Sequence, residues 1–577
     1  MKAIRIIVMT AVLVFCCWST GSAQNWTWLG GAADLLKGSY GTLGVEASEN
    51  QPLSRAYFAT WVDAGGNFWL FGGNCWTGMA YGRTNDLWKY NPVTGNWTWM
   101  HGSTQFNQTG VYGYPGVGDP ANTPGARCYA STWTDAAGNL WLFGGEGYSQ
   151  SSFGYLNDLW KYDISTGNWT WITGSKYANN AGSYGTMGVE SAMNSPRSRL
   201  KAASWTDAAG NLWLFGGYRS GHMNDLWRYN VSTGYWTWMK GSSVPNQYGT
   251  YGTQGVESST STPGGRYAPA YWTDASGSLW LFGGGGCAES IIGWLNDLWK
   301  YNPSTGNWTW MQGSKLTEQP GSYGVKGTES PSNHPGARDA SMSWTDGVGN
   351  FWMFGGNGHG KAAAGRLNDL WKLNMATGNW VWMSGSDDRN SFGTHGSFGV
   401  ENPANTPGAR YLGGSWMGND GNLWLFGGTG FMETTRDCYL NDVWRFNTAS
   451  GQWAWKDGLN SFQYGTYGTR GVPASTNWPG ARNNAASWTD SNGDLWMFGG
   501  LAYMESAGGI ASDLWKYSNS TGNWTWMNGP RIPNQYGTYG SMGVPDANNA
   551  PGSRRLTATW TDASGNLWMF GGDGHAE

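Results

Sequence analysis

Short apolar runs recur along this chain at a fixed spacing, with polar, glycine-rich segments between them. The clearest run is Asn139-Leu-Trp-Leu-Phe-Gly-Gly145, in which four apolar residues precede two glycines. Four apolar residues in succession predict a short buried strand, and the glycines predict an end where the backbone needs conformations that glycine adopts freely. Variants of the run end at Gly73, Gly217, Gly284, Gly356, Gly428, Gly500 and Gly572.

The spacing of these eight runs indicates the class of fold. Successive copies are 72 residues apart, except for one interval of 67 residues. Periods of this size are typical of solenoids, propellers and other repeat arrays. The length of 577 residues would otherwise suggest three or four domains. Because each repeat must pack against its neighbours, we expect a single repeat domain instead.

The second repeat shows four predicted strands. Residues 127–134 alternate small and large side chains, residues 140–143 are the apolar run, residues 157–162 read Asn-Asp-Leu-Trp-Lys-Tyr, and residues 169–172 read Trp-Thr-Trp-Ile. The turns Asp-Ala-Ala-Gly-Asn and Ser-Thr-Gly-Asn separate the first pair and the last pair of strands. Four short antiparallel strands in each repeat predict one blade of a β-propeller.

A link of about 25 residues joins each predicted fourth strand to the next first strand, and it carries a Gly-Ser-Tyr-Gly or similar sequence. Loops of this length are uncommon in compact domains. Since the link recurs in every repeat, we expect an ordered segment that lies over the edge of a blade.

These residues resemble the kelch motif. The resemblance rests on the apolar run into Gly-Gly, on Asn-Asp-Leu-Trp-x-Tyr, and on a tryptophan seven residues after that tyrosine, as from Tyr162 to Trp169. It covers nearly all of residues 25–572, although the repeats are longer than the common kelch form. The resemblance implies an all-β, kelch-type β-propeller of four-stranded antiparallel blades, similar to the central domain of galactose oxidase.

The two ends of the chain bear on the number of blades. Residues 55–527 contain seven complete blades, residues 554–570 supply the first two strands of another, and residues 26–29 supply a fourth strand. Pairing strands from both ends in one blade protects their exposed edges. We therefore expect eight blades, with the last one truncated and lacking its third strand. Seven blades with leftover strands remain the alternative.

Residues 1–23 are similar to a secretory signal peptide. Lys2 and Arg5 precede the apolar residues 6–15, and Gly-Ser-Ala at 21–23 predicts cleavage near Ala23. We expect the mature domain, residues 24–577, to be secreted or exposed at the cell surface. No other run approaches the length of a membrane span.

Composition narrows the partners. Of 43 tryptophans, 39 lie at recurring strand positions, which favours a role in packing the core. Loss of the leader leaves 32 basic against 38 acidic side chains, a net charge of −6. Without a basic run, nucleic acid and anionic membranes are not expected as partners. The expected partner of a monomeric protein without a cofactor is an extracellular protein or a glycan.

Most length variation lies between the second and third strands. Counted from the first glycine of each pair, the strand-three aspartate follows after 9 to 15 residues, whereas the next glycine pair follows that aspartate after 57 or 58. Variable loops on a constant scaffold are typical of recognition sites. The candidate binding residues are Trp76, Tyr148, Arg219, His222, Trp294, His359, Phe431 and Arg436.

An arginine opens each predicted first strand, and an aspartate opens each third strand. We expect bidentate pairs, namely Arg127 with Asp158, Arg199 with Asp225 and Arg338 with Asp369. The alternative is a ring of arginines open to an acidic ligand. That alternative fails if the guanidinium groups are buried against the aspartates.

Evidence for catalysis is thin. The galactose oxidase resemblance implies a copper centre with two histidines and two tyrosines, one of them cross-linked to cysteine. The six histidines, at 101, 222, 334, 359, 395 and 575, share no repeat position and no metal-ligand spacing, so no metal site is expected. For glycoside hydrolysis, which needs two placed carboxylates, the variable loops offer Glu146, Glu289, Glu433 and Glu505.

Four cysteines follow the leader, in a compartment that permits disulfides. Cys75 and Cys128 lie in adjacent repeats and are compatible with a disulfide, whereas Cys287 and Cys438 are expected to be unpaired.

The sequence thus predicts an exported kelch-type propeller that binds a carbohydrate or a protein through its strand two to three loops. The alternatives are an oxidase-like or glycosidase-like enzyme, and a structural spacer of a longer secreted protein.

Overall fold

The computed structural model describes residues 14–17, 25–30, 38–53, 55, 57–76, 81–274, 276–458, 463–541, 544–561 and 565–575. Every regular element in these segments is a β-strand. The chain forms two compact units, which are described separately. The described residues from 38 to 317 belong to unit 1, and those from 14 to 30 and from 318 to 575 belong to unit 2.

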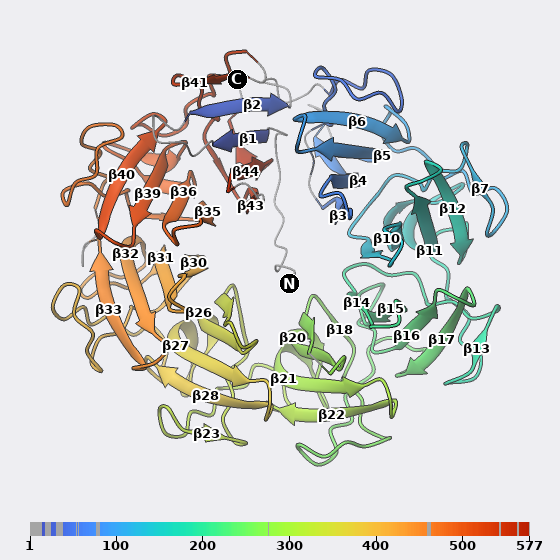
Figure 1. The fold of residues 1–577 in the computed structure, drawn as a ribbon. Helices are drawn as coiled ribbons and strands as arrows, with labels where there is room; N and C mark the ends of the chain where they lie inside the picture. Colours follow the sequence, from blue (N-terminus) through green and yellow to red (C-terminus); the bar gives the residue numbers. More distant parts are fainter. Residues whose placement is uncertain are drawn as a thin grey trace. The chain divides into compact units, whose positions relative to one another are not determined.

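Unit 1 contains four blades, each with four main strands in antiparallel order (Figure 1). Blade 1 consists of β3 (Ala59–Val62), β4 (Phe68–Trp76), β5 (Tyr81–Asn91) and β6 (Asn96–His101). Blade 2 consists of β9 (Ser131–Thr134), β10 (Leu140–Tyr148), β11 (Phe153–Asp163) and β12 (Asn168–Thr173). Blade 3 consists of β14 (Ala203–Thr206), β15 (Leu212–Phe215), β16 (Leu226–Asn230) and β17 (Tyr235–Lys240). Blade 4 consists of β19 (Ala270–Thr273), β20 (Leu279–Cys287), β21 (Ile292–Asn302) and β22 (Asn307–Gln312). Two-residue strands flank them, namely β7 (Gly118–Asp119), β8 (Arg127–Cys128), β13 (Glu190–Ser191) and β18 (Arg266–Tyr267).

Unit 2 repeats this arrangement in blades 5 to 7. Blade 5 consists of β25 (Met342–Thr345), β26 (Phe351–His359), β27 (Ala364–Asn374) and β28 (Asn379–Ser384). Blade 6 consists of β30 (Gly414–Met417), β31 (Leu423–Gly430), β32 (Cys438–Asn447) and β33 (Gln452–Asp457). Blade 7 consists of β35 (Ala486–Thr489), β36 (Leu495–Phe498), β39 (Leu514–Ser518) and β40 (Asn523–Asn528). The accompanying short strands are β23 (Glu329–Ser330), β24 (Arg338–Asp339), β29 (Arg410–Tyr411), β34 (Arg482–Asn483), β37 (Leu501–Tyr503) and β38 (Gly508–Ile510).

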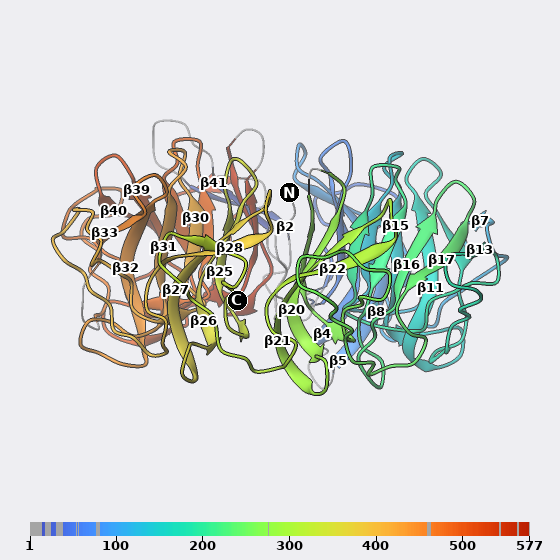
Figure 2. The same ribbon diagram turned by 90° about the horizontal axis from the view of Figure 1, so that it is seen from below.

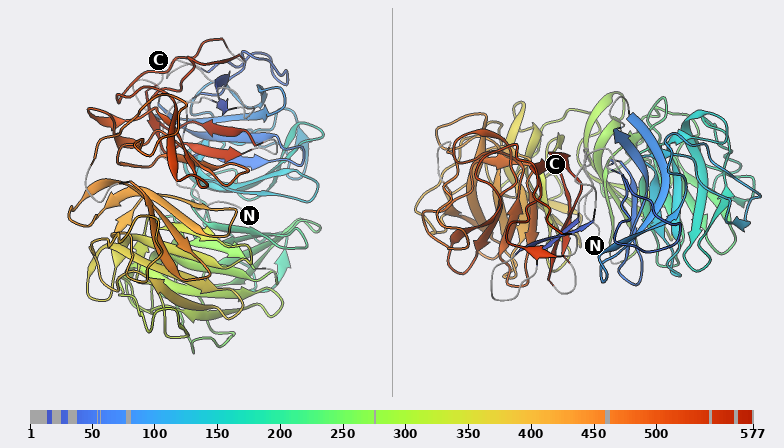
Figure 3. Two further views of the ribbon diagram at one scale, coloured as in Figure 1. Left: turned by 60° about the vertical axis from the view of Figure 1, so that its left-hand side comes forward. Right: turned by 90° about the horizontal axis from the view of Figure 1, so that it is seen from above.

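The first strands of consecutive blades are neighbours within each unit. In unit 1, β9 contacts both β3 and β14, and β14 contacts β19; in unit 2, β30 contacts β25 and β35. The fourth strands lie on the outer side of their blades (Figure 1). In side view, the hairpins β20–β21 and β26–β27 extend to one end of their respective units (Figure 2), and Figure 3 shows the sheets of each unit from two further directions. The repeated four-stranded sheets confirm the predicted fold class, a multi-blade β-propeller.

An eighth sheet in unit 2 combines strands from both ends of the chain. Its order is β41 (Pro545–Asp546), β2 (Trp26–Gly30), β1 (Val14–Cys17), β44 (Leu567–Phe570) and β43 (Ala558–Thr561). As expected, residues after Asn25 supply the fourth strand and the C-terminal repeat supplies the first two. The third position, predicted to be missing, is occupied by β1. We call this sheet blade 8; β42 (Arg554–Arg555) and β45 (Asp573–Gly574) pair beside it.

The glycine pair that ends each apolar run is required by backbone conformation and by space. In blade 2, Gly144 and Gly145 have φ angles of +65° and +90°. A Cβ atom on Gly145 would lie 2.5 Å from the carbonyl oxygen of Cys128. The pairing of β10 with β11 shifts register at this point, between Phe143 and Gly145. The glycines therefore mark a bulge at which strand two bends and continues into the variable hairpin.

Aromatic side chains fill the space between neighbouring blades. Between blades 2 and 3, the ring of Trp141 lies 5.5 Å from Tyr229, and Phe143 lies 5.8 Å from Trp236. The Trp133 indole also donates to the carbonyl oxygen of Trp205 at 2.9 Å. The recurring tryptophans of strands one to three are thus core residues, as their pattern predicted.

Each long link covers the outer edge of the following blade. After blade 2, Gly188 donates to the carbonyl oxygen of Trp238 at 2.8 Å, and β13 pairs with β17. Asn194 of the same link donates to the carbonyl oxygen of Trp236 at 3.0 Å. These bonds satisfy an otherwise unpaired sheet edge. The expectation of an ordered segment over a blade edge is confirmed.

Candidate functional site

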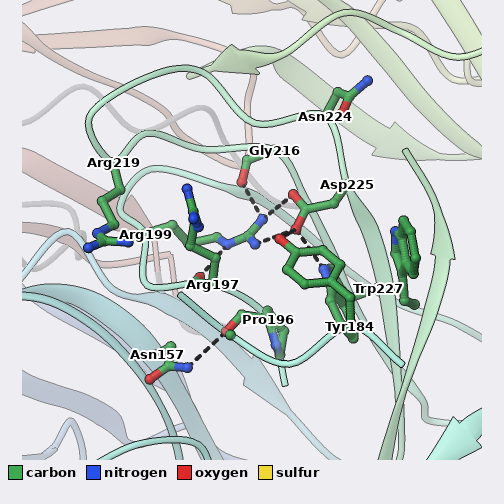
Figure 4. A network of polar contacts seen from close by, with 12 residues as sticks. Asn157, Tyr184, Pro196, Arg197, Arg199, Gly216, Arg219, Asn224, Asp225 and Trp227 are labelled. Carbon is green, nitrogen blue, oxygen red and sulfur yellow. Dashed lines mark hydrogen bonds and ion pairs between the residues drawn. The ribbon is translucent and has the colours of Figure 1, made fainter. Parts of the chain in front are cut away.

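Beneath the variable loops lies a buried polar network, drawn for blade 3 in Figure 4. Arg199 binds Asp225 through both terminal nitrogens, at 2.6 and 2.5 Å, and donates to the carbonyl oxygen of Gly216 at 2.8 Å. The Tyr184 hydroxyl and the Trp227 indole both donate to Asp225 Oδ2 at 2.7 Å. Burial opposes ionisation of Asp225, but Arg199 and these hydrogen bonds outweigh it and hold the pKa of Asp225 below its usual value.

The same network recurs in six further blades. Its ion pairs join Arg55 to Asp86, Arg127 to Asp158, Arg266 to Asp297, Arg338 to Asp369, Arg410 to Asp442 and Arg482 to Asp513. The side chains of these pairs are at most 1% exposed. The expected pairing is therefore present, and the alternative of an open arginine ring is wrong because the guanidinium groups are buried against aspartates.

The tyrosine of the network was not foreseen from the sequence. It comes from the long link, at Tyr40, Tyr112, Tyr184, Tyr251, Tyr323 and Tyr467. The signal was available, because this tyrosine is the centre of the recurring Gly-Ser/Thr-Tyr-Gly sequence. What the sequence did not reveal is that the link folds back far enough to reach the buried aspartate.

Two blades depart from this network. In blade 6, His395 replaces the tyrosine, and its Nε2 lies 3.7 Å from Asp442 Oδ2 while its Nδ1 lies 3.8 Å from Glu433. In blade 8, Arg554 is 2% exposed, and no carboxylate of the described residues pairs with it. Neither residue is an open ligand site, since both lie inside their blades.

Outside the buried network, side chains vary from blade to blade. The residue after each glycine pair lies opposite residues of the preceding and following strands. We call these sets the post-glycine rows: Asn74 and Arg83; Cys128, Glu146 and Tyr155; Leu200, Tyr218 and His222; Tyr267, Gly285 and Trp294; Asp339, Asn357 and Arg366; Tyr411, Thr429 and Tyr439; Asn483, Leu501 and Ile510; Arg555 and Asp573.

In unit 1, contacts connect the rows of neighbouring blades. Arg83 forms an ion pair with Glu146 at 2.8 Å, and its guanidinium carbon lies 4.6 Å from the ring centre of Phe153. The rings of His222 and Tyr267 are 5.5 Å apart with their planes at 24°. Charged and aromatic groups are therefore held side by side by strands that are rigidly joined beneath them.

A second set of side chains lies where the backbone is left-handed, two residues after the network arginine. Tyr57, Tyr129, Lys201 and Ala268 have φ angles between +49° and +60°, and each of the last three donates its N–H to the carbonyl oxygen of the one before. The rings of Tyr57 and Tyr129 are 4.4 Å apart, and Lys201 Nζ lies 4.7 Å from the Tyr129 ring centre. Non-glycine residues in this region are uncommon and often mark functional sites.

In unit 2, the post-glycine rows make contacts of the same kind. Arg366 pairs with Asp437, and its guanidinium carbon lies 5.3 Å from the ring centre of Tyr411. The rings of Tyr439 and Tyr503 are 5.3 Å apart. Each unit therefore presents its own sequence of side chains on the same framework.

The predicted binding residues of unit 1 differ in their surroundings. Trp294 is 42% exposed, and Tyr148 packs its ring 5.2 Å from Phe153. Arg219 donates to the carbonyl oxygen of Asn179 at 2.6 Å, and burial followed by repulsion from Arg197 lowers its pKa. His222 belongs to a post-glycine row, and burial lowers its pKa. The side chain of Trp76 lies outside the described part of the chain.

Those of unit 2 lie apart from one another. His359 contacts Glu318, with 3.0 Å between Nε2 and Oε2. Phe431 is only 5% exposed and packs against Phe392, so it is a core residue of its loop. The Arg436 guanidinium carbon lies 5.3 Å from the ring centre of the same Phe392.

The four loop glutamates lie beside basic side chains. Beyond the pairs already given for Glu146 and Glu433, Glu289 lies 3.9 Å from Lys315 Nζ, and Glu505 lies 3.2 Å from Arg531 Nη1. Each glutamate thus has a separate basic neighbour. This arrangement does not provide the carboxylate pair that glycoside hydrolysis uses.

The expected disulfide is absent. Cys75 and Cys128 are both buried free thiols, as is Cys287, and Cys438 is a partly exposed free thiol. Burial raises the pKa of Cys75 to about 11, which keeps this thiol protonated at neutral pH. The two thiols lie in different surroundings, Cys75 beside the Arg55–Asp86 pair and Cys128 beside Arg83.

The copper centre implied by the galactose oxidase resemblance does not fit the described residues. Among them, no group of three histidine, cysteine, aspartate or glutamate side chains is arranged to hold a metal ion. A scan against protein-family models finds no match for the chain. The described segments contain no helix with the length and apolar character of a membrane span.

Proposed function

We propose that this protein is an exported, kelch-type propeller that serves as a binding module for an extracellular carbohydrate or protein. The recurring Gly-Gly and Asn-Asp-Leu-Trp-x-Tyr sequences support the kelch assignment, and residues 1–23 support export. The ligand contacts the hairpins between the second and third strands. Recognition on such loops is typical of scaffolds whose framework is constant and rigid.

One observation carries this proposal: the exposed apolar tip of the blade 4 hairpin. Ile291, Ile292 and Trp294 are 54%, 47% and 42% exposed. In blade 2 the residue that corresponds to Ile292 is Phe153, 43% exposed, with the Arg83 guanidinium over its ring. Adjacent exposed apolar side chains beside charged groups are typical of interaction sites.

The proposal is tested on glycan and protein arrays with purified residues 24–577. The variant Ile292→Ser with Trp294→Ala removes the apolar tip. The control variant Val93→Ser with Tyr114→Ala removes an aliphatic and an aromatic side chain that are 91% and 80% exposed but lie outside these hairpins.

A ligand that binds the parent and the control but binds the hairpin variant at least about tenfold more weakly supports the proposal. The array on which the ligand appears decides between carbohydrate and protein. Absence of any specific ligand, or equal binding by all three proteins, contradicts the proposal and favours a structural spacer.

A further inference from the structure

Blade 8 contains a buried arginine that lacks the partner found in every other blade. Arg554 Nε donates to the carbonyl oxygen of Gly552 at 2.9 Å, and Nη1 donates to that of Gly571 at 3.1 Å. These bonds match those of Arg199 in blade 3. However, Arg554 Nη2 is buried and has no hydrogen-bond acceptor among the described residues. In the seven other blades, this nitrogen binds an aspartate of strand three.

The strand that occupies the third position of blade 8 carries no carboxylate. β1 reads Val-Phe-Cys-Cys, and Phe15, Cys16 and Cys17 pair with Met569, Trp568 and Leu567 of β44. In blade 2, the corresponding residues of strand two pair with Trp160, Lys161 and Tyr162. The backbone of β1 therefore takes the place of Trp-Lys-Tyr, and it belongs to the predicted leader.

The missing group has a defined chemistry, because seven copies of the correct strand exist in the same chain. Each presents an aspartate to the arginine and, two residues later, a tryptophan whose indole donates to that aspartate, as Trp160 does to Asp158 at 2.7 Å. A buried guanidinium without a counter-ion is strongly unfavourable. Burial indeed lowers the pKa of Arg554, in contrast to the raised pKa of Arg199.

We propose that the position between β44 and β2 is an acceptor site for an extended strand of a partner polypeptide with the sequence Asn-Asp-Leu-Trp. The aspartate binds Arg554 in the bidentate geometry of the other blades. The backbone of the incoming strand pairs with β44 and β2, a form of strand addition. The inference takes the removal of the leader as its premise, and it is independent of the loop-based recognition proposed above.

The test uses residues 24–577 and a labelled synthetic copy of β11, Phe153–Asp163. Fluorescence anisotropy measures binding, and hydrogen–deuterium exchange locates it. The expected result is saturable binding with new protection of residues 567–570 and 26–30. A peptide with Asp158→Asn, which keeps the shape but loses the charge, is expected to bind at least about tenfold more weakly.

Two protein variants identify the arginine. With Arg554→Met, the parent and Asp158→Asn peptides are expected to bind equally, because the charge has lost its partner. The control Arg555→Met, which removes the neighbouring, partly exposed pair with Asp573, is expected to keep the preference for aspartate.

Three outcomes overturn the proposal: no binding to residues 24–577, equal binding of the two peptides by the parent protein, or protection confined to other blades. If Arg554→Met does not fold, the comparison of the two peptides on the parent protein still decides. On residues 1–577 with the leader retained, peptide binding is expected to weaken, because β1 competes for the same position; unchanged binding contradicts the assigned position.

Discussion

His395 Nε2 lies 3.7 Å from Asp442 Oδ2, at the place where six other blades put a tyrosine hydroxyl within 2.6 to 2.8 Å of the aspartate. The histidine ring lies 5.0 Å from Trp444 and 4.9 Å from Trp455. Tyr112 has nearly the same surroundings in blade 2, 4.9 and 5.2 Å from its two tryptophans. The pocket therefore suits a tyrosine, and the histidine is too short to complete the network.

This comparison predicts that His395→Tyr stabilises the protein. Both ring nitrogens of His395 are buried without a hydrogen-bond partner among the described residues, whereas a tyrosine hydroxyl would donate to Asp442. The expected gain is about 1 kcal/mol in the free energy of unfolding, seen as a higher Tm by calorimetry. The reverse change in blade 7, Tyr467→His, is the matched control and should lower Tm. A lower Tm for His395→Tyr would contradict the prediction.

Breaking one buried ion pair should be costly. Asp225→Asn leaves Arg199 buried without a counter-ion, and the expected loss is about 3–5 kcal/mol. The control is Asp387→Asn, because the Lys361–Asp387 pair is 68% and 36% exposed and should contribute less than about 1 kcal/mol. Thermal unfolding and hydrogen exchange in blade 3 measure the effect. Equal Tm values for the two variants would show that the buried pair contributes nothing special.

Asp457 predicts a pH dependence of stability. Burial raises the pKa of this carboxyl to about 7 against the opposing bond from the Gly458 N–H. Because the folded protein then binds the proton more tightly than the unfolded chain, the free energy of unfolding falls as pH rises from about 4 to about 7. Above pH 7, the penalty has a ceiling of about 4 kcal/mol, at about 1.4 kcal/mol per pKa unit.

The variant Asp457→Asn removes this titration. Blade 7 already has Asn528 at the equivalent place, where it accepts the Gly529 N–H at 2.6 Å. We expect Asp457→Asn to be more stable than the parent at pH 8, with the difference disappearing toward pH 4. Denaturant unfolding at both pH values measures it, and a pH-independent difference would contradict the pKa shift.

The glycine pair predicts a contrast between two glycines of blade 2. Gly138 and Gly145 have similar φ angles, +84° and +90°. A Cβ atom on Gly138 meets nothing within 4 Å, whereas one on Gly145 meets three backbone atoms within 3.2 Å. We expect Gly138→Ala to cost about 1 kcal/mol from backbone strain alone, and Gly145→Ala to cost clearly more. Tm values of the two variants provide the comparison.

Features that repeat along the chain were predictable, because they depend on neighbouring residues. The alternation before Asp135, the apolar run 140–143 and the tight turns predicted the strands of each blade, and the recurrence of Arg127 and Asp158 at equivalent strand starts predicted their pairing. A strand pattern and a turn are local properties, so one repeat contains the information and the other repeats confirm it.

Contacts between repeats were decided by the tertiary structure. The approach of Tyr184 to Asp225, the coverage of β17 by the preceding link, the contact of Arg83 with Glu146 and the unpaired Nη2 of Arg554 all join segments far apart in sequence. The prediction of a Cys75–Cys128 disulfide failed for the same reason, since adjacent repeats do not specify which side chains meet. The chemistry of each blade can be read from its own residues, but side-chain distances across blades follow only from how the sheets pack.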